Sequence, residues 1–396
     1  MTHPAPGQFD VAPVPRRPAG ETVLPGLPGP DGQPGSWRRA PGGLDVRSWV
    51  MAGSALMAVV LLSLVSLLPL PYVLLRPGPV RDVLGTTEGT AEGTPMIAVD
   101  GAPTYDTEGS LDMLTVTISG GPGSSASLWS VLEGWVLPSV AVRPVEEQYP
   151  PDLTEEEIDE ENAVSMVSSQ ESATAAALAE LDIAYETTLS VAGFADGSDA
   201  AARLRRGDVV TGLAGATVPD LPQLRDALQE TSPGEPVTVR VERDGQPVDV
   251  DVRTGEGPDG TTVLGVLLEP SYEFPFDVRI EIEDIGGPSA GMMFSLGIVD
   301  VLTPGAMTGG RDIAGTGTID AAGEVGPIGG IRQKLYGAER AGADWFLAPS
   351  DNCEEVVGHV PGSLRVVSVQ TLADARAAVE AIGSDEGTDR LPTCRR

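Results

Sequence analysis

Two residues of this sequence have the chemistry needed for acyl transfer, a serine and a lysine. Lys334 is the only lysine in the chain, and every other member of its 25 basic residues is an arginine. Arginine stays protonated in proteins, whereas a buried lysine can lose its proton and act as a base. Ser289 lies in a small-residue turn, Gly-Gly-Pro-Ser-Ala-Gly, that spans positions 286 to 291. A serine and a neutral lysine can catalyse acyl transfer without a histidine, and this chain has only His3 and His359.

Each of these two residues also has an ordinary structural interpretation. Serine is among the best N-cap residues of helices, so Ser289 alone need not be a nucleophile. Its neighbouring glycines would let a substrate approach the backbone, and unpaired N–H groups at a helix start could stabilise an oxyanion. A lysine is commonly a solvated surface residue with a pKa of about 10.4, which burial must lower to about 7–8 before the amine acts as a base. The surface interpretation of Lys334 is weak in a chain that uses arginine elsewhere.

Composition excludes some classes of function. The formal net charge of −33 argues against a nucleic-acid partner, because a basic face would be hard to assemble from so few cations. Cys353 and Cys394 are too few and too far apart for a zinc site, and they could form one disulfide or remain free thiols. Chemistry by a serine and a lysine requires no metal or cofactor, and we expect none.

An apolar segment from Trp49 to Leu75 is long enough to cross a bilayer. We expect a transmembrane anchor over residues 47–76. A cleaved signal peptide is the alternative, but no small-residue cleavage site follows the segment. Arginines before the segment place the N-terminus in the cytoplasm, so everything after residue 76 would be extracytoplasmic. Residues 1–46 are rich in proline and glycine, and we expect a disordered cytoplasmic tail.

The rest of the chain separates by pattern. Residues 77–165 mix short strand-like runs with loops and end near an acidic stretch at 152–161, which favours a β-containing linker region with a solvated helix rather than a calcium site. Residues 255–385 alternate strands and helices, which predicts a compact α/β domain. A short C-terminal tail, 386–396, follows.

Residues 166–254 resemble a bacterial-type PDZ domain. The resemblance is carried by Leu-Arg-Arg-Gly-Asp at 204–208, a helical segment at 220–228, and a predicted hairpin with Asp244-Gly245 at its turn. PDZ domains bind extended peptides by adding a strand to a sheet edge. We expect that edge near Leu181, Ile183 and Tyr185, although a glycine-containing loop for a C-terminal carboxylate is not clear. The alternative is a structural spacer.

The α/β region resembles the proteolytic domain of Lon-type peptidases. The resemblance rests on five segments in order: Gly-Pro-Ser-Ala-Gly at 287–291, Met-Thr-Gly-Gly at 307–310, Gly-Thr-Gly-Thr-Ile at 315–319, the run 325–334, and Ala-Gly-Ala at 341–343. It implies Ser289 as nucleophile and Lys334 as general base. It further implies that Gly287 supports the serine turn and that Thr316 or Thr318 orients the lysine. Many Lon domains have an acidic residue where this chain has Gly286, and whether Asp284 compensates is open.

The expected architecture is an α/β Lon-type proteolytic domain with a PDZ-like β-rich domain and one N-terminal transmembrane helix. We expect a membrane-anchored extracytoplasmic serine endopeptidase. A Walker A loop needs Gly-Lys-Ser/Thr, but the one lysine follows Gln333, so cleavage should be ATP-independent and its protein or peptide substrates unfolded or flexible. Because Gly286 stands where many Lon domains have an acidic residue, the alternative hypothesis is a catalytically inactive PDZ/Lon-like peptide-binding scaffold. The resemblance also implies a homo-oligomer, a hexamer by family analogy.

Overall fold

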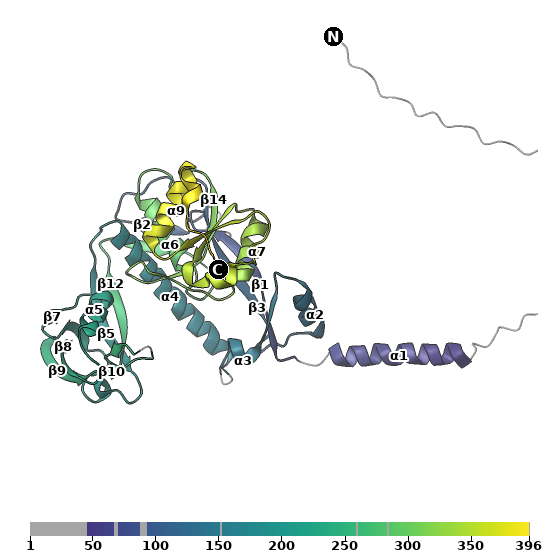
Figure 1. Cartoon of the computed structure of the whole chain (residues 1–396), viewed down its shortest axis with the longest axis horizontal. Coiled ribbons are helices and arrows are strands. Elements are labelled where there is room, and N and C mark those ends of the chain that lie inside the picture. Colours follow the sequence, from purple (N-terminus) through teal and green to yellow (C-terminus); the bar gives the residue numbers. More distant parts are fainter. Residues whose placement is uncertain are drawn as a thin grey trace, which may run out of the picture. The chain divides into compact units, whose positions relative to one another are not determined.

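A computed structural model of the chain describes residues 46–66, 70–87, 93–150, 153–258, 260–282 and 285–395 (Figure 1). The chain divides into two units, Met1–Val60 and Leu61–Arg396. The predicted tail at 1–46 lies almost entirely outside the described residues. The first described element is helix α1 (Val46–Ser66), in which the window Val46–Leu64 has a mean hydropathy of 1.6 and no buried residue. Its length and composition fit a candidate membrane span.

The predicted anchor at 47–76 is wrong at its C-terminal end. Helix α1 ends at Ser66, and strand β1 (Tyr72–Asp82) begins six residues later. Val73 and Leu74 are almost fully buried in this strand. The apolar run that we assigned to the membrane is therefore two runs, one in the helix and one in the core of a sheet. Pro69 and Pro71 lie between them, where proline disfavours a continuous helix.

The larger domain is built on a mixed sheet with strand order β18-β17-β14-β3-β1-β4. The pairs β14–β3, β14–β17 and β17–β18 are parallel, whereas β1 pairs with β3 and β4 in antiparallel fashion. The other strands of this sheet are β3 (Ser110–Ser119), β4 (Ala141–Pro144), β14 (Asp312–Gly315), β17 (Trp345–Pro349) and β18 (Arg365–Val369). Smaller pairs are β2 (Ile97–Asp100) with β13 (Asp277–Ile280), and β15 (Thr318–Ile319) with β16 (Val325–Gly326).

This sheet corrects two predicted boundaries. Residues 77–165 are not a linker region, because β1, β3 and β4 lie in the same sheet as β14, β17 and β18. The predicted domain at 255–385 is thus only the second half of a domain that begins at β1. The acidic stretch does form part of a helix: α4 (Glu155–Glu180) starts with a capping box between Thr154 and Glu157. We call the domain around this sheet the α/β domain.

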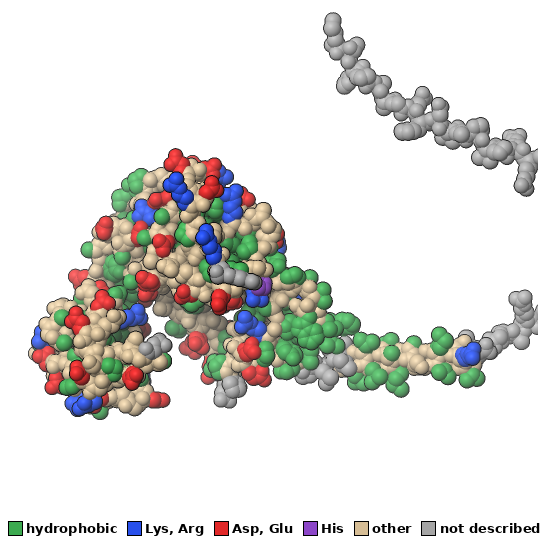
Figure 2. All heavy atoms as spheres, in the orientation of Figure 1, with side chains coloured by type: hydrophobic (Ala, Val, Ile, Leu, Met, Phe, Trp, Pro, Cys, Tyr) green, Lys and Arg blue, Asp and Glu red, His purple; other side chains and the backbone are tan. Residues whose placement is uncertain are grey.

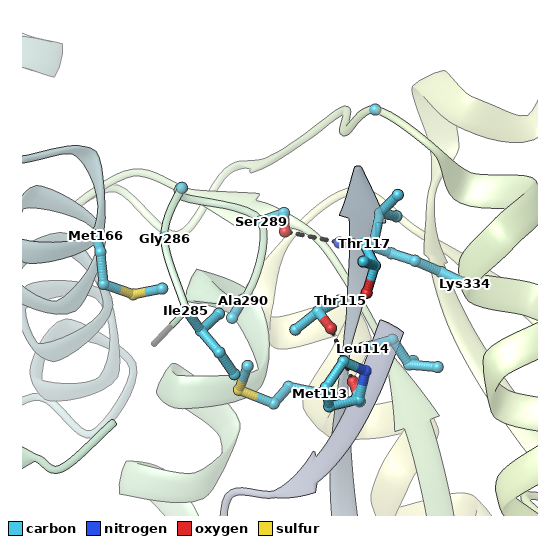
Figure 3. Close-up of a pocket in the computed structure, with 14 residues that line it drawn as sticks. Met113, Leu114, Thr115, Thr117, Met166, Ile285, Gly286, Ser289, Ala290 and Lys334 are labelled. Carbon is cyan, nitrogen blue, oxygen red and sulfur yellow. Dashed lines mark hydrogen bonds between the residues drawn. The ribbon is translucent and has the colours of Figure 1, made fainter. Parts of the chain in front are cut away.

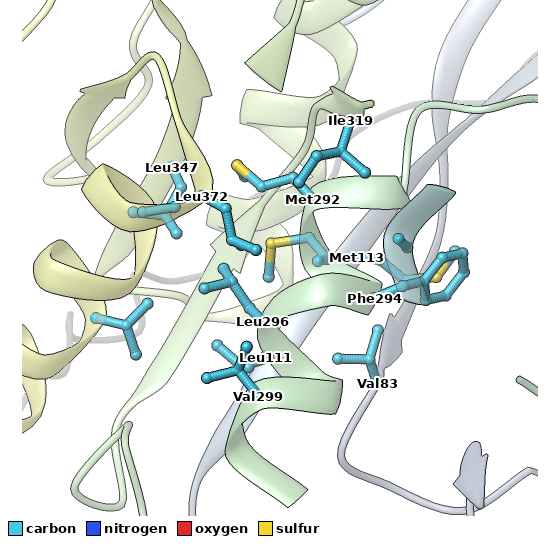
Figure 4. Packing of buried hydrophobic residues seen from close by; sticks show 14 of the residues in the cluster. Val83, Leu111, Met113, Met292, Phe294, Leu296, Val299, Ile319, Leu347 and Leu372 are labelled. Atoms are coloured by element: carbon cyan, nitrogen blue, oxygen red, sulfur yellow. The ribbon is translucent and has the colours of Figure 1, made fainter. Parts of the chain in front are cut away.

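Helices cover both faces of the α/β sheet. On one face α6 (Gly291–Leu302) packs with α4 and α9 (Leu372–Ser384) around Leu111 and Met113 of β3 (Figure 4). On the other face α7 (Ile331–Ala341) packs against β1 and β3, where Leu114 joins a second cluster. Side chains alternate between the two faces of a strand, so β3 contributes to both cores. The remaining helices are α2 (Leu128–Val136), α3 (Val145–Gln148) and α8 (Cys353–Val356).

A second sheet, with order β12-β5-β6-β8-β9, is inserted between α4 and β13. Its predicted helix and hairpin are confirmed: α5 spans Leu221–Gln229, and Asp244 and Gly245 both have positive φ between β8 and β9. Its strands are β5 (Glu186–Phe194), β6 (Val209–Leu213), β7 (Ala216–Thr217), β8 (Pro236–Arg243), β9 (Gln246–Arg253) and β12 (Val266–Glu273), with the short pair β10 (Gly255–Glu256) and β11 (Thr262–Val263) beside them. We call this part the inserted domain.

The predicted N-terminal limit of the inserted domain, 166, is wrong, because residues 166–180 belong to α4. The predicted C-terminal limit, 254, leaves out the edge strand β12, which lies after it in the chain. The expected binding edge at Leu181, Ile183 and Tyr185 is also wrong, because residues 181–185 form no strand. Leu181 packs against the core of the α/β domain instead, and the Ile183 N–H donates to the end of α4.

The C-terminal segment is fixed to the α/β domain. Cys353 and Cys394 form a disulfide, which decides the alternative that the sequence left open. Leu391 packs against the core and the Ser368 N–H donates to the Pro392 carbonyl at 2.9 Å. The predicted tail at 386–396 is therefore part of the folded domain up to Cys394.

Candidate active site

The structure brings Ser289 and Lys334 together at one end of the α/β sheet. Lys334 Nζ lies 2.6 Å from Ser289 Oγ, and the two side chains point toward one another (Figure 3). Lys334 Nζ also donates to Thr316 Oγ1 at 2.8 Å. Of the two threonines proposed to orient the lysine, Thr316 makes this contact, whereas Thr318 lies in β15 opposite Gly326.

Burial changes the chemistry of Lys334. The side chain is only 2% exposed, and burial lowers its pKa from 10.5 to about 7. Helix α7 carries it against β3, and a Cβ at Gly330 would lie 2.8 Å from the Val116 side chain. Gly330 has φ +71° at the helix N-cap, a conformation that favours glycine. Gly330 thus lets α7 lie close to the sheet, where the amine of Lys334 is buried.

Helix α4 fastens the turn that holds Ser289. The Gly287 N–H donates to the Asn162 carbonyl at 3.0 Å, and Ser169 Oγ donates to the Pro288 carbonyl at 3.1 Å. A Cβ at Gly286 would lie 2.7 Å from Asn162 Cβ, so α4 leaves no room for a side chain there. This contact gives a steric reason for glycine where many Lon domains have an acid. Asp284 lies outside the described residues.

The Ser289 side chain does not cap a helix. The N-cap of α6 is Ala290, and the Ser289 hydroxyl contacts Lys334 instead. Its backbone carbonyl accepts from Thr316 Oγ1 at 2.8 Å and from the Gly317 N–H at 3.0 Å. Gly287 has φ +85°, which lets the chain reverse just before the serine. Thr316 therefore connects the two candidate residues, since it contacts the amine of one and the backbone of the other.

A cavity of about 410 Å³ opens beside the Ser289 hydroxyl. Its apolar wall is formed by Met113, Met166, Ile285 and Ala290, which Figure 3 shows around the serine turn. Strand β3 forms another wall. Strand β14 pairs with β3 only as far as Met113, so the following residues of β3 present an edge that β14 leaves unpaired. An extended peptide could pair with such an edge and place a side chain in the apolar cavity.

Sequence reasoning missed several residues that build this site. Asn352 is 3% exposed, accepts from the Ile328 N–H at 2.9 Å and donates to the Ile328 carbonyl at 3.0 Å. These bonds fix the loop that precedes α7 and Lys334. Asn162 and Ser169 do the same for the serine turn. Each binds backbone that lies far away in the sequence, and no local pattern signals such a bond.

The arrangement can perform nucleophilic catalysis. An amine with a pKa near 7 is half neutral at pH 7 and largely neutral above it, and the neutral form can take the proton of a hydroxyl 2.6 Å away. The backbone N–H groups of Ser289 and Ala290 donate to no acceptor among the described residues, and they precede the positive end of the α6 dipole. Such groups can stabilise an oxyanion.

Comparisons with known proteins agree with this geometry. The C-terminal proteolytic domain of Lon proteases matches residues 283–379, which include Ser289, Thr316 and Lys334. A PDZ domain matches residues 186–254. This chain carries a Lon-type proteolytic domain and a PDZ domain. The Lon-type domain extends beyond its matched range, because that range shares its sheet with β1, β3 and β4, and the PDZ domain is inserted within it.

The similar proteins cover only parts of the chain. Lon protease 1 of Bacillus subtilis is 37% identical over 109 residues, which are 26% of this chain and 13% of that protein. A Lon protease of Azospirillum brasilense is 41% identical over 91 residues, 22% of this chain and 11% of that protein. The crystal structure of the PDZ domain of an SdrC-like protein from Listeria monocytogenes is 21% identical, covers 20% of this chain and 85% of that chain, and has a TM-score of 0.20. This chain therefore spans only a small part of the curated relatives that it matches, and the shared Lon-type domain supports a serine peptidase.

Proposed function

We propose that this chain is a membrane-anchored serine endopeptidase in which Ser289 is the nucleophile and Lys334 the general base. The observation that carries the proposal is the 2.6 Å contact between Ser289 Oγ and a buried amine whose pKa is about 7. A serine hydroxyl is a weak nucleophile unless a neighbouring base removes its proton. The competing hypothesis of an inactive scaffold gives no reason to keep a lysine buried at this position.

The reaction would proceed through an acyl-enzyme. Neutral Lys334 takes the proton of Ser289 Oγ as that oxygen attacks the peptide carbonyl carbon, and the N–H groups of Ser289 and Ala290 hold the oxyanion. The Lys334 ammonium then gives its proton to the leaving amine as the peptide bond breaks. A water molecule then loses a proton to neutral Lys334 and attacks the ester carbon, and the Lys334 ammonium returns that proton to Ser289 Oγ as the ester bond breaks and the acid product leaves. Thr316 accepts one N–H of the amine, which leaves the nitrogen lone pair for Ser289.

Substrates would bind as extended chains. The unpaired edge of β3 beyond Met113 supports pairing with a peptide strand, and the cavity beside Ser289 supports an apolar side chain next to the scissile bond. A folded domain could not enter a cleft of this size, so unfolded or flexible segments are the proposed substrates. Lys334 is the only lysine in this sequence, so no Walker A loop is present and cleavage would be ATP-independent.

The membrane anchor and the side of the membrane are also part of the proposal. Helix α1 supplies a span of sufficient length, and the arginines that precede it favour a cytoplasmic N-terminus. The Cys353–Cys394 disulfide supports an oxidising compartment for the α/β domain, because disulfides persist mainly outside the cytosol.

The PDZ domain would present peptide to the protease. Its free edge strand β12 and helix α5 flank a cavity of about 610 Å³ that Tyr185 and Tyr272 help to line. Residues 320–322 of the α/β domain line the same cavity. Leu221 lies there at the start of α5, and Leu221→Arg should weaken capture of a long unfolded substrate while leaving cleavage of a short peptide unchanged. Equal loss of both activities would argue against a presenting role.

The nucleophile is tested by paired serine variants of the full chain. Ser289→Ala should abolish cleavage of a fluorescently labelled, permanently unfolded protein in the absence of nucleotide. Ser295→Ala is the matched control, since Ser295 lies on α6 and its hydroxyl bonds, among the described residues, only the carbonyls of Ala173 and Gly291. The control should retain most of its activity. Unchanged cleavage by the Ser289→Ala protein would refute the assignment, and binding without cleavage by the wild type would favour the scaffold.

A further inference from the structure

Helix α2 exposes a cluster of large apolar side chains that the fold does not use. Trp129 is 57% exposed, Trp135 66% and Val136 80%, and Leu132 is exposed between them. Figure 2 shows hydrophobic side chains gathered over this helix. Scattered apolar residues are normal on a protein surface, but contiguous ones with two tryptophans mark a binding surface. We call these four residues the α2 apolar face.

The core of the α/β domain is complete without the α2 apolar face. Val131 and Gly134 are buried on the other side of the helix, where α2 packs against β1 and β4. A Cβ at Gly134 would lie 2.5 Å from the Val142 side chain, so glycine lets the helix rest directly on the sheet. Trp129 and Trp135 therefore do not contribute to the packing of α2 onto the sheet. Their exposure indicates a surface that binds another partner.

Helix α2 also carries little charge. Glu133 is its only charged residue, and Arg76 of β1 holds it in an ion pair at 2.9 Å. An apolar face without an unpaired charge can enter the interfacial region of a bilayer at low electrostatic cost. Tryptophan favours that region because its ring is apolar while its N–H remains hydrogen-bonded to water or headgroups.

The covalent chain keeps α2 near the end of α1. Helix α1 ends at Ser66, and Leu70 is bridged to Ala126, the residue before the N-cap Ser127 of α2. Four residues of chain from Ser66 to Leu70 span at most about 14 Å. If α1 crosses a bilayer, the start of α2 must then lie within roughly 20 Å of the point at which the chain leaves it.

We propose that the α2 apolar face docks on the surface of the bilayer that α1 spans, with Trp129 and Trp135 at headgroup level. The inference rests on the proposed membrane anchoring and adds a second point of attachment, which would restrict rotation of the protease about its tether. The preferred surface is zwitterionic lipid such as phosphatidylcholine, since α2 offers no free cation and the chain carries a net charge of −33. A second copy of the chain is the competing occupant.

Tryptophan fluorescence in vesicles tests the proposal. The full chain is reconstituted into phosphatidylcholine vesicles, with and without lipid brominated near the headgroup end of its acyl chains, which quenches nearby tryptophans. The chain has five tryptophans, so replacement of the others by phenylalanine gives three proteins. One retains Trp129 and Trp135, one retains Trp49 of α1, and one retains Trp345, which is 8% exposed inside the α/β domain. Circular dichroism and the unfolding midpoint check that each protein is folded.

The expected result is that brominated lipid reduces the emission of the Trp129 and Trp135 protein by about half or more, and that the Trp345 protein is unaffected. The Trp49 protein distinguishes failure of docking by the α2 apolar face from failure of the membrane anchor itself. Quenching of Trp49 without quenching of Trp129 and Trp135 would overturn docking while the anchor stands. Absence of quenching in both would overturn the anchor and docking together. If Trp129 and Trp135 resist both brominated lipid and aqueous acrylamide, a second copy or another protein covers the face, and the proposal is also wrong.

Discussion

The Asn162 carbonyl accepts the backbone N–H of Gly287 at 3.0 Å, two residues before Ser289. Asn162 lies on α4, which ends at Glu180 and leads within six residues into β5 of the PDZ domain. The helix that positions the nucleophile is therefore the same element that joins the PDZ domain to the protease. Gly286 and Ser169 complete this contact, because one gives α4 room to approach and the other bonds the Pro288 carbonyl.

Thr316 is expected to act as a positioning residue for Lys334. Its hydroxyl accepts from Nζ and donates to the Ser289 carbonyl, so Thr316→Val should lower kcat by about 10- to 100-fold, whereas Thr316→Ser should retain most activity. A bond accepted from the amine favours its charged form, so its loss should lower the pKa of Lys334 further. The rising limb of the pH–rate profile should then move to lower pH in Thr316→Val. A uniform loss of activity with an unchanged profile would indicate a merely structural role.

Burial of Lys334 should lower the free energy of unfolding. Its pKa is about 7 in the folded chain and 10.5 when exposed, so the unfolded chain binds the proton more tightly. The penalty is complete below about pH 7 and disappears as the pH rises through 10.5. Lys334→Met should thus raise the free energy of unfolding by about 2 kcal/mol at pH 7, after the lost hydrogen bonds are counted. The unfolding midpoints of the wild type and of Lys334→Met should therefore converge as the pH rises from 6 to 10. A stability gain in Lys334→Met that does not vary with pH would contradict the lowered pKa of Lys334.

Asn352 is expected to stabilise the loop before α7. Asn352→Ala would leave both polar groups of the buried Ile328 backbone without their partner, which should cost about 2–4 kcal/mol of unfolding free energy. Ser350→Ala is the control, because in the described part of the chain the Ser350 hydroxyl bonds only exposed Asp351, and its loss should change stability by less than about 0.5 kcal/mol. Denaturant unfolding of both variants measures the difference. Similar midpoints would show that the loop does not depend on Asn352.

Met166 should set the preference for the side chain next to the scissile bond. It reaches the cavity from α4, so Met166→Ala should enlarge the apolar wall and favour larger substrate side chains. The ratio of kcat/KM for phenylalanine over alanine on the acyl side of the bond should rise about 10-fold. Met307→Ala is a matched control, because Met307 is buried in the same core but does not line the cavity. An equal change of preference in the control would assign the effect to loosened packing.

Local sequence patterns predicted the elements that are continuous in the chain. The helical segment expected at 220–228 occurs as α5 (Leu221–Gln229), and the turn at Asp244 and Gly245 followed from its residue types. The α/β class and the PDZ-like sheet were predicted correctly. The two candidate catalytic residues could be named in advance for two reasons. Lys334 is the only lysine in a chain that otherwise uses arginine, and Ser289 lies in an unusual turn of small residues.

Long-range pairing could not be predicted from those patterns. Strand β14 pairs with β3, with Asp312 opposite Ser110, and nothing in either segment indicates a partner about two hundred residues away. For the same reason we expected the binding edge of the PDZ domain at residues 181–185. The edge strand is β12 instead, which pairs with β5 and lies after the expected domain boundary in the chain. The apolar residues Tyr72–Leu75 were assigned to the membrane anchor, because hydropathy alone does not distinguish a buried strand from a lipid-facing helix.

The pH dependence of kcat/KM tests the Ser289–Lys334 mechanism most directly. A fluorogenic peptide with an apolar residue before the scissile bond would be followed from pH 5.5 to pH 9, with the wild type and Lys334→Arg compared. The account predicts a rate that rises with unit slope and levels above an apparent pKa of about 7, because only the neutral amine can take the serine proton. Lys334→Arg should be inactive throughout, since arginine stays protonated. A flat profile in the wild type, or substantial turnover by Lys334→Arg, would contradict the mechanism.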